Sequence, residues 1–223
     1  MANHYIGIGA TGAKILEAMT YLVASGVVDS EQNFMYFIDS DHENGNWRVC
    51  NNIISLYRKI RDYREYTQVL PKSLFLNKIT SIAPTNKNNF NVVGTEKSSL
   101  WDVLGESLNN NASQRYQNLK KILYDPSQLE KLTKKKALFS KGFVGSASIG
   151  SAVISISIEK DNFGPLIRKK IQQEDNIVIL GSLFGGMGAS GIPTILNYLH
   201  KENIHPNNIA LVLALPYFKL NSE

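Results

Sequence analysis

Hydrophobic positions along the chain gather in short runs, and most of these runs end at glycines or at carboxylates. Between the first two runs, apolar residues recur at helical spacing from Ile15 to Val23, and Gly26 ends that pattern. β-rich runs that alternate with helical patterns are typical of a buried parallel sheet. We therefore predict a doubly wound α/β fold with helices on both faces of the sheet. The strands are predicted at His4–Ile8, Phe34–Ile38, Asn176–Leu180 and Ile209–Leu215.

A glycine-rich turn follows the first predicted strand and reads Gly9-Ala10-Thr11-Gly12-Ala13-Lys14. The second strand stops at Asp39-Ser40-Asp41. A glycine turn after the first strand and carboxylates after the second are the general plan of a nucleotide site. The turn is not a P-loop, because that motif places Lys directly after its last glycine and here Ala13 intervenes.

A second and richer glycine segment follows the third predicted strand, between Gly181 and Pro193. Five glycines fall within eleven residues, and a helical pattern follows, so we expect a helix to begin near Pro193. Glycines allow successive N–H groups to face an oxyanion, and a helix start adds its positive end. The segment predicts a phosphate cradle, with a close-packed turn as the alternative.

Two further stretches have a different character. Ser140–Gly150 is rich in glycine and serine, and a helical pattern from Val153 to Ile167 follows it, which Gly164-Pro165 should interrupt. Residues from about Asn44 to Lys141 are rich in Asn, Lys, Ser and Tyr, and we predict that they form a largely helical insertion. The helical patterns within the insertion are Ile53–Arg64, Leu100–Leu108 and Gln114–Leu123.

Partner contacts particular to this protein are expected in that insertion rather than in the sheet. Tyrosines alternate with arginines near Tyr57, which suggests nucleic-acid binding, but an amphipathic helix explains the pattern better. The net charge of +5 comes largely from Lys120–Lys141, which is typical of a solvated helix end. A nucleic-acid partner is therefore not expected.

Composition narrows the remaining possibilities. The chain has 223 residues, 43% of them hydrophobic, which is enough for a substantial core. A lone cysteine, Cys50, excludes an internal disulfide, and the four histidines are scattered, so metal catalysis by Cys or His is not expected. No apolar run approaches the roughly 18 residues of a membrane span. These features lead us to expect a cytoplasmic protein without a membrane span.

The order of these motifs resembles the nucleotide-binding domain of the tubulin and FtsZ superfamily, most closely its prokaryotic tubulin-like members. Met187 stands where that family usually has Thr, and one extra residue lies between the last two glycines. The matching segments are Ile6–Lys14 with the first glycine loop, Ile38–Asp41 with the Asn-Thr-Asp segment, Gly142–Gly150 with the loop that senses the γ-phosphate, Gly185–Gly191 with the signature Gly-Gly-Gly-Thr-Gly-Ser-Gly, and Leu215–Phe218 with the ribose-side loop.

This resemblance implies a three-layer Rossmann-like domain that binds GTP or GDP, with Mg²⁺ a possible companion, and that associates with itself or with a protein partner. Asp39 and Asp41 are expected to position waters of Mg²⁺ or the γ-phosphate, and turn formation or helix capping is the alternative role. The implied nucleotide contacts are Gly9, Ala10, Thr11, Gly12, Lys14, Asp39, Asp41, Ser146, Ala147, Ser148, Gly185, Gly186, Met187, Gly188, Ala189, Ser190, Gly191 and Pro216.

The family's long central helix and its water-activating domain have no counterpart after Leu215. No catalytic residue is therefore assigned, and we expect this chain to bind GTP without hydrolysing it alone. One alternative is a dinucleotide-binding oxidoreductase domain, with Gly7, Gly9 and Gly12 on the pyrophosphate of NAD(P) and Asp39 on a ribose hydroxyl. Another is an interaction module that keeps the fold without the nucleotide.

Overall fold

A parallel sheet forms the centre of the molecule. The computed structural model describes residues 1–28, 30–41, 44–67, 74–81, 90–91, 142–143, 146–160, 163–204 and 208–215. Five strands follow the order β3-β2-β1-β5-β6, and the short β4 pairs with the carboxyl end of β2. Their bounds are β1 (Asn3–Ile8), β2 (Gln32–Asp39), β3 (Lys78–Ser81), β4 (Phe90–Asn91), β5 (Asn176–Ser182) and β6 (Asn208–Ala214).

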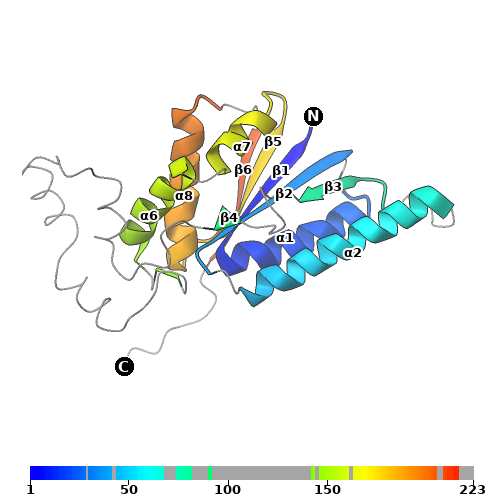
Figure 1. Ribbon diagram of the computed structural model, residues 1–223, viewed down its shortest axis with the longest axis horizontal. Helices are drawn as coiled ribbons and strands as arrows, with labels where there is room; N and C mark the ends of the chain where they lie inside the picture. The colour runs from blue at the N-terminus through cyan, green and yellow to red at the C-terminus, as the bar shows by residue number, and fades with distance from the viewer. Residues whose placement is uncertain are drawn as a thin grey trace, which may run out of the picture.

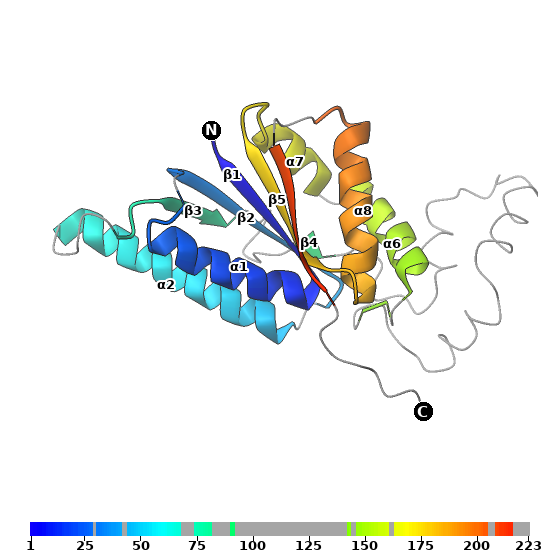
Figure 2. The ribbon, with the colours of Figure 1, turned by 180° about the vertical axis from the view of Figure 1, so that it is seen from behind.

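Helices cover both faces of this sheet, as Figures 1 and 2 show from opposite sides. One face carries α1 (Gly9–Ala24) and α2 (Gly45–Thr67), and the other carries α6 (Ala147–Lys160), α7 (Phe163–Lys170) and α8 (Gly186–Lys201). The predicted α/β fold with a parallel sheet is therefore confirmed. Chain order reverses between β1 and β5, so that α1 leaves toward one face and α8 toward the other.

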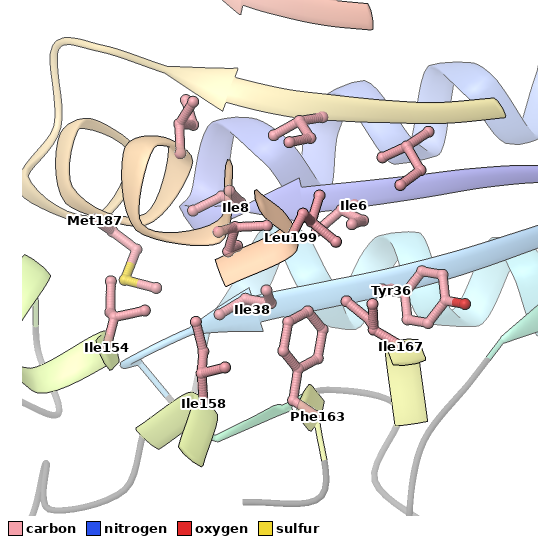
Figure 3. Close-up of a cluster of buried hydrophobic side chains, with 14 of the residues drawn as sticks. Ile6, Ile8, Tyr36, Ile38, Ile154, Ile158, Phe163, Ile167, Met187 and Leu199 are labelled. Carbon is pink, nitrogen blue, oxygen red and sulfur yellow. The ribbon is translucent and has the colours of Figure 1, made fainter. Parts of the chain in front are cut away.

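Apolar side chains fill the space on each side of the sheet. On the α6–α8 side, isoleucines of β1 and β2 pack against Ile154, Ile158 and Phe163 (Figure 3). On the α1–α2 side, Trp47 stacks on Phe37 with ring centroids 4.5 Å apart. Alternate residues of each strand thus enter opposite cores, which explains why the strands read as unbroken apolar runs.

A ladder of asparagines fixes the register of four strands at the amino end of the sheet. Three of the four asparagines donate a hydrogen bond from the side-chain amide to the side-chain oxygen of the asparagine on the next strand, and Asn33 is the last acceptor. A slip by one residue would break these bonds and turn every core side chain to the wrong face. The bonds run from Asn208 to Asn176 at 2.8 Å, from Asn176 to Asn3 at 2.8 Å and from Asn3 to Asn33 at 3.4 Å.

A buried polar cluster lies at the same end of the sheet. His4 contacts the Asp175 carboxylate through Nε2 at 3.1 Å and the Tyr36 hydroxyl through Nδ1 at 2.8 Å. Burial lowers the pKa of His4, against the opposite effect of Asp175. Burial alone would raise the pKa of Asp175, but N–H groups of Gln172 and Ala2, together with His4, hold it below its usual value.

One sequence expectation about a helix boundary is corrected, and another is confirmed. Helix α8 begins at Gly186 and contains Pro193 well inside it, rather than beginning near Pro193. Glycines and a proline disfavour a helix by themselves, but the glycines let α8 approach the sheet closely. The packing gained in this way outweighs the lost helix propensity and the one hydrogen bond that Pro193 cannot donate. The pattern from Val153 to Ile167 is divided as expected: α6 ends at Lys160 and a new helix, α7, begins at Phe163, with Gly164 and Pro165 in its first turn, where a proline is tolerated.

The stretch from Asn44 to Lys141 is not wholly an insertion. Helix α2 includes the predicted helical pattern Ile53–Arg64 and packs on α1, while β3 and β4 both pair with β2. The beginning of this stretch therefore belongs to the sheet and its covering layer. The patterns at Leu100–Leu108 and Gln114–Leu123 and the lysines of Lys120–Lys141 lie outside the described residues.

Candidate functional site

A cavity of about 310 Å³ opens where β1, β2 and β5 end. It lies beside the point where the strand order reverses, and ligands of open α/β sheets bind at this position. The described residues that line it are Ile8, Gly9, Ala10, Thr11, Asp39, Asp41, Asn44, Gly142, Phe143, Ser182, Gly185, Gly186, Met187 and Gly188.

Three helices begin at this cavity, and two of them, α1 and α8, do so without a side-chain cap on the preceding residue. Helix α1 starts directly at Gly9 and α8 starts at Gly186, with Ile8 and Gly185 as the residues that precede them. Neither preceding residue supplies a side-chain cap, and neither first turn carries an acidic side chain. The first N–H groups of both helices therefore receive no side-chain cap from the residue before the helix, and both positive helix ends adjoin the cavity.

Several of the glycines serve close packing rather than ligand binding. A Cβ atom on Gly12 would lie 2.7 Å from the carbonyl carbon of Gly7 and 2.8 Å from the oxygen of Leu180. A Cβ on Gly188 would overlap the Ser182 carbonyl, and one on Gly191 would lie 2.8 Å from the Ile8 side chain. These glycines let α1 and α8 approach the strands, so the close-packed alternative accounts for part of the motif.

Two other glycines behave differently. Gly9 has φ +69°, which side chains rarely adopt, so the chain needs glycine there to turn from β1 into α1. Gly185 has φ −92°, and nothing lies within 4 Å of the position its Cβ would take. Neither backbone conformation nor packing therefore requires a glycine at 185. Its missing side chain leaves open space beside the cavity.

Met187, the main departure from the tubulin-like signature, is only 8% exposed. Its side chain lies in the core near Ile154, as Figure 3 shows. The longer side chain is thus accommodated mostly inside the protein, and the backbone of the first α8 turn still lines the cavity.

The acidic side of the cavity is held by hydrogen bonds within the chain. Asp39 accepts the Asn44 side-chain amide at 2.5 Å and the Asp41 backbone N–H at 3.1 Å, and it is 4% exposed. Burial raises the pKa of Asp39, against the opposing effect of these hydrogen bonds. Asn44 in turn accepts the N–H groups of Asn46 and Trp47 and so caps α2. The contact with the Asp41 N–H is the turn role considered for Asp39, whereas the residue that caps a helix here is Asn44.

The charge of the lining has a consequence for any ligand. Among the described residues of the lining there are two carboxylates, Asp39 and Asp41, and no Lys or Arg. Attraction for an anion must therefore come from backbone N–H groups, from helix ends or from a cation that accompanies the ligand. In the part of the chain that the structure describes, no three His, Cys, Asp or Glu side chains gather as a metal site.

The structure brings together half of the eighteen expected contacts. Gly9, Ala10, Thr11, Asp39, Asp41 and Gly185–Gly188 line the cavity. Eight others lie outside the lining: Gly12 is buried in α1, Lys14 is exposed on α1, Ser146 to Ser148 lie at the start of α6, and Ala189 to Gly191 lie within α8. Pro216 lies outside the described residues.

Sequence reasoning assigned no contact to five of the lining residues, among them Ile8, the last residue of β1. Asn44 could have been found, because an Asn that precedes a helical pattern is a typical N-cap. Gly142 and Phe143 belong to the stretch that was expected near the γ-phosphate, but only Ser146, Ala147 and Ser148 of that stretch were assigned contacts. Ser182 carries no sequence signal beyond its place at the end of β5.

None of the described helices is long and apolar enough to cross a membrane. Comparison with known proteins identifies no relative: no family model, no curated protein and no solved structure matches this chain.

Proposed function

We propose that the cavity binds a nucleotide through its phosphate groups, and that the nucleotide is GTP or GDP, as the resemblance to tubulin and FtsZ implies. One observation carries the proposal. Helices α1 and α8 leave opposite faces of the sheet at the strand-order reversal, and both start at one cavity without side-chain caps. Helix starts of this kind bind phosphate through free N–H groups and a positive end.

The proposed contacts divide between the two helix starts. The turn at Gly9, Ala10 and Thr11 approaches the phosphates from β1, and the turn at Gly185 and Gly186 approaches them from β5. Because successive N–H groups of a first helical turn point along the axis, two such turns can hold neighbouring phosphates of one ligand. Gly185 supports this arrangement, because its open Cβ position leaves room for the ligand.

A divalent cation is part of the proposal. The two carboxylates of the lining repel a bare polyphosphate, and no basic side chain of the lining residues that the structure describes offsets them. Mg²⁺ binds phosphate oxygens, carboxylates and water, so a magnesium nucleotide would bring the missing positive charge to this site. Asp41, which is less buried than Asp39, is the carboxylate best placed to face its water shell.

A ligand panel tests the proposal. Calorimetric titrations with GTP, GDP, ATP and NAD, each with and without Mg²⁺, should show binding of the guanine nucleotides above the others. Binding of NAD alone would instead support a dinucleotide-binding domain. Absence of binding by all four ligands would contradict the proposal and favour an interaction module. Self-assembly in a tubulin-like manner is a further proposal, which light scattering with and without GTP would test.

A further inference from the structure

Strand β6 forms one lateral edge of the sheet, beyond β5 (Figure 2). It pairs with β5 along its whole length, from Asn208 to Ala214, and no other described strand pairs with it. Its outer row of backbone N–H and C=O groups therefore has no strand partner within the described residues. Such a row is a template for pairing with another strand.

The side chains of β6 are apolar and exposed on both faces. Ile209, Leu211 and Val212 are 44%, 45% and 44% exposed. Ile209 and Leu211 align with β5 residues of the α6–α8 core, while Val212 aligns with Leu180 of the α1–α2 core. Apolar side chains with these neighbours are suited to burial on both sides of a sheet.

The opposite edge of the same sheet provides a comparison. Strand β3 has only four residues, Lys-Ile-Thr-Ser, so it is short, polar and charged at its start. Short length and a lysine are among the usual protections of a free edge. The seven residues of β6, Asn-Ile-Ala-Leu-Val-Leu-Ala, contain no charge, no proline and no glycine. The β6 edge thus lacks the protections that β3 carries.

We propose that β6 pairs with β6 of a second copy of this chain, in antiparallel direction about a twofold axis. The strand is self-complementary in this arrangement. With the axis at Leu211, Leu211 meets Leu211 of the second copy, and Ile209 meets Leu213, all on one face. The smaller residues Ala210 and Val212 meet on the other face, and no charges of like sign face each other across the axis.

The size of the interface sets its strength. Seven paired residues a side are far fewer than the roughly 20–30 a side of a standard interface. The dimer should therefore form and dissociate reversibly with protein concentration. No β6 residue lines the cavity, so this inference does not rest on the proposed nucleotide binding.

Sedimentation velocity over a wide range of protein concentration tests the pairing. The parent chain should show a reversible dimer, and Leu211→Lys should weaken it at least about tenfold, because two ammonium groups would then meet at the axis. Val212→Lys, on the opposite face of the strand, should also weaken the dimer, because a lysine would replace the apolar contact of Val212 with Ala210 of the second copy, and it serves if the first variant does not fold. Leu56→Lys is the matched control, because Leu56 is 57% exposed on α2 and should leave the dimer unchanged.

Hydrogen exchange locates the interface in the parent chain. Outward-facing amides of β6 should exchange more slowly as the protein concentration rises, while those of β3 should not change. The inference is overturned if the chain is monomeric throughout the concentration range. It is also overturned if a dimer forms but both β6 variants keep it, or if Leu56→Lys dissolves it equally.

Discussion

Replacement of Gly12 by Ala tests whether this glycine serves packing rather than the ligand. The added Cβ would lie 2.7 Å from the Gly7 carbonyl carbon and 2.8 Å from the Leu180 oxygen. Ordinary contact begins near 3.4 Å, so these distances are about 0.7 and 0.6 Å too short. Both atoms belong to the backbone of central strands, so α1 must move instead, and overpacking of this kind costs about 1–3 kcal/mol.

Helix propensity acts in the opposite direction, because Ala within a helix is favoured over Gly by up to about 1 kcal/mol. We therefore expect a net loss of up to about 2 kcal/mol in the free energy of unfolding, measured by urea titration. For a chain of this size, each kcal/mol lowers Tm by about 2–4 °C. Gly185→Ala is the control and should change stability little, since its Cβ meets nothing. A Gly12→Ala variant more stable than the parent by the full propensity gain would refute the packing argument.

Three further predictions concern ligand, pH and metal. Gly185→Glu should weaken nucleotide binding about tenfold or more while the isosteric Gly185→Gln weakens it less, because only Glu places a charge beside the phosphates; calorimetry measures both. Stability should fall as the pH drops below about 6.5, because the lowered pKa of His4 makes the unfolded chain bind the proton more tightly. The lowered pKa of Asp175 adds a further loss of stability as the pH falls below 3.8 and through the pKa of the folded state. The midpoint of urea unfolding, measured against pH, should therefore decline in acid, and it should decline less for His4→Gln. Removal of Mg²⁺ with EDTA should weaken nucleotide binding, and Asp41→Asn should reduce that dependence; equal affinity with and without metal would contradict the charge argument.

The strands could be predicted closely from the sequence because local signals bound them. The first is observed at Asn3–Ile8 against the predicted His4–Ile8, and the second at Gln32–Asp39 against Phe34–Ile38. Each is an apolar run that ends at glycine or at carboxylates, and such runs need no knowledge of distant residues. Gly26 was likewise predicted to end the first helix, and it adopts φ +79° just after α1.

The role of each glycine could not be predicted in this way. Gly12 and Gly188 look like ligand-binding residues in a glycine-rich motif, but their neighbours are backbone atoms of Gly7, Leu180 and Ser182. Those contacts depend on how helices sit on the sheet, which the local pattern does not contain. The same limit explains Pro193, because tertiary packing of α8 outweighs the local tendency of proline to start a helix.

Amide chemical shifts at the two helix starts test the central claim most directly. The claim is that α1 and α8 hold the phosphates of one ligand, so GTP with Mg²⁺ should shift the amide resonances of Gly9–Thr11 and of Gly185–Gly188 together, at the same ligand concentration. Amides at the amino end of the sheet, such as that of Asn176, should not move. Shifts at neither helix start, or at one without the other, would contradict the account.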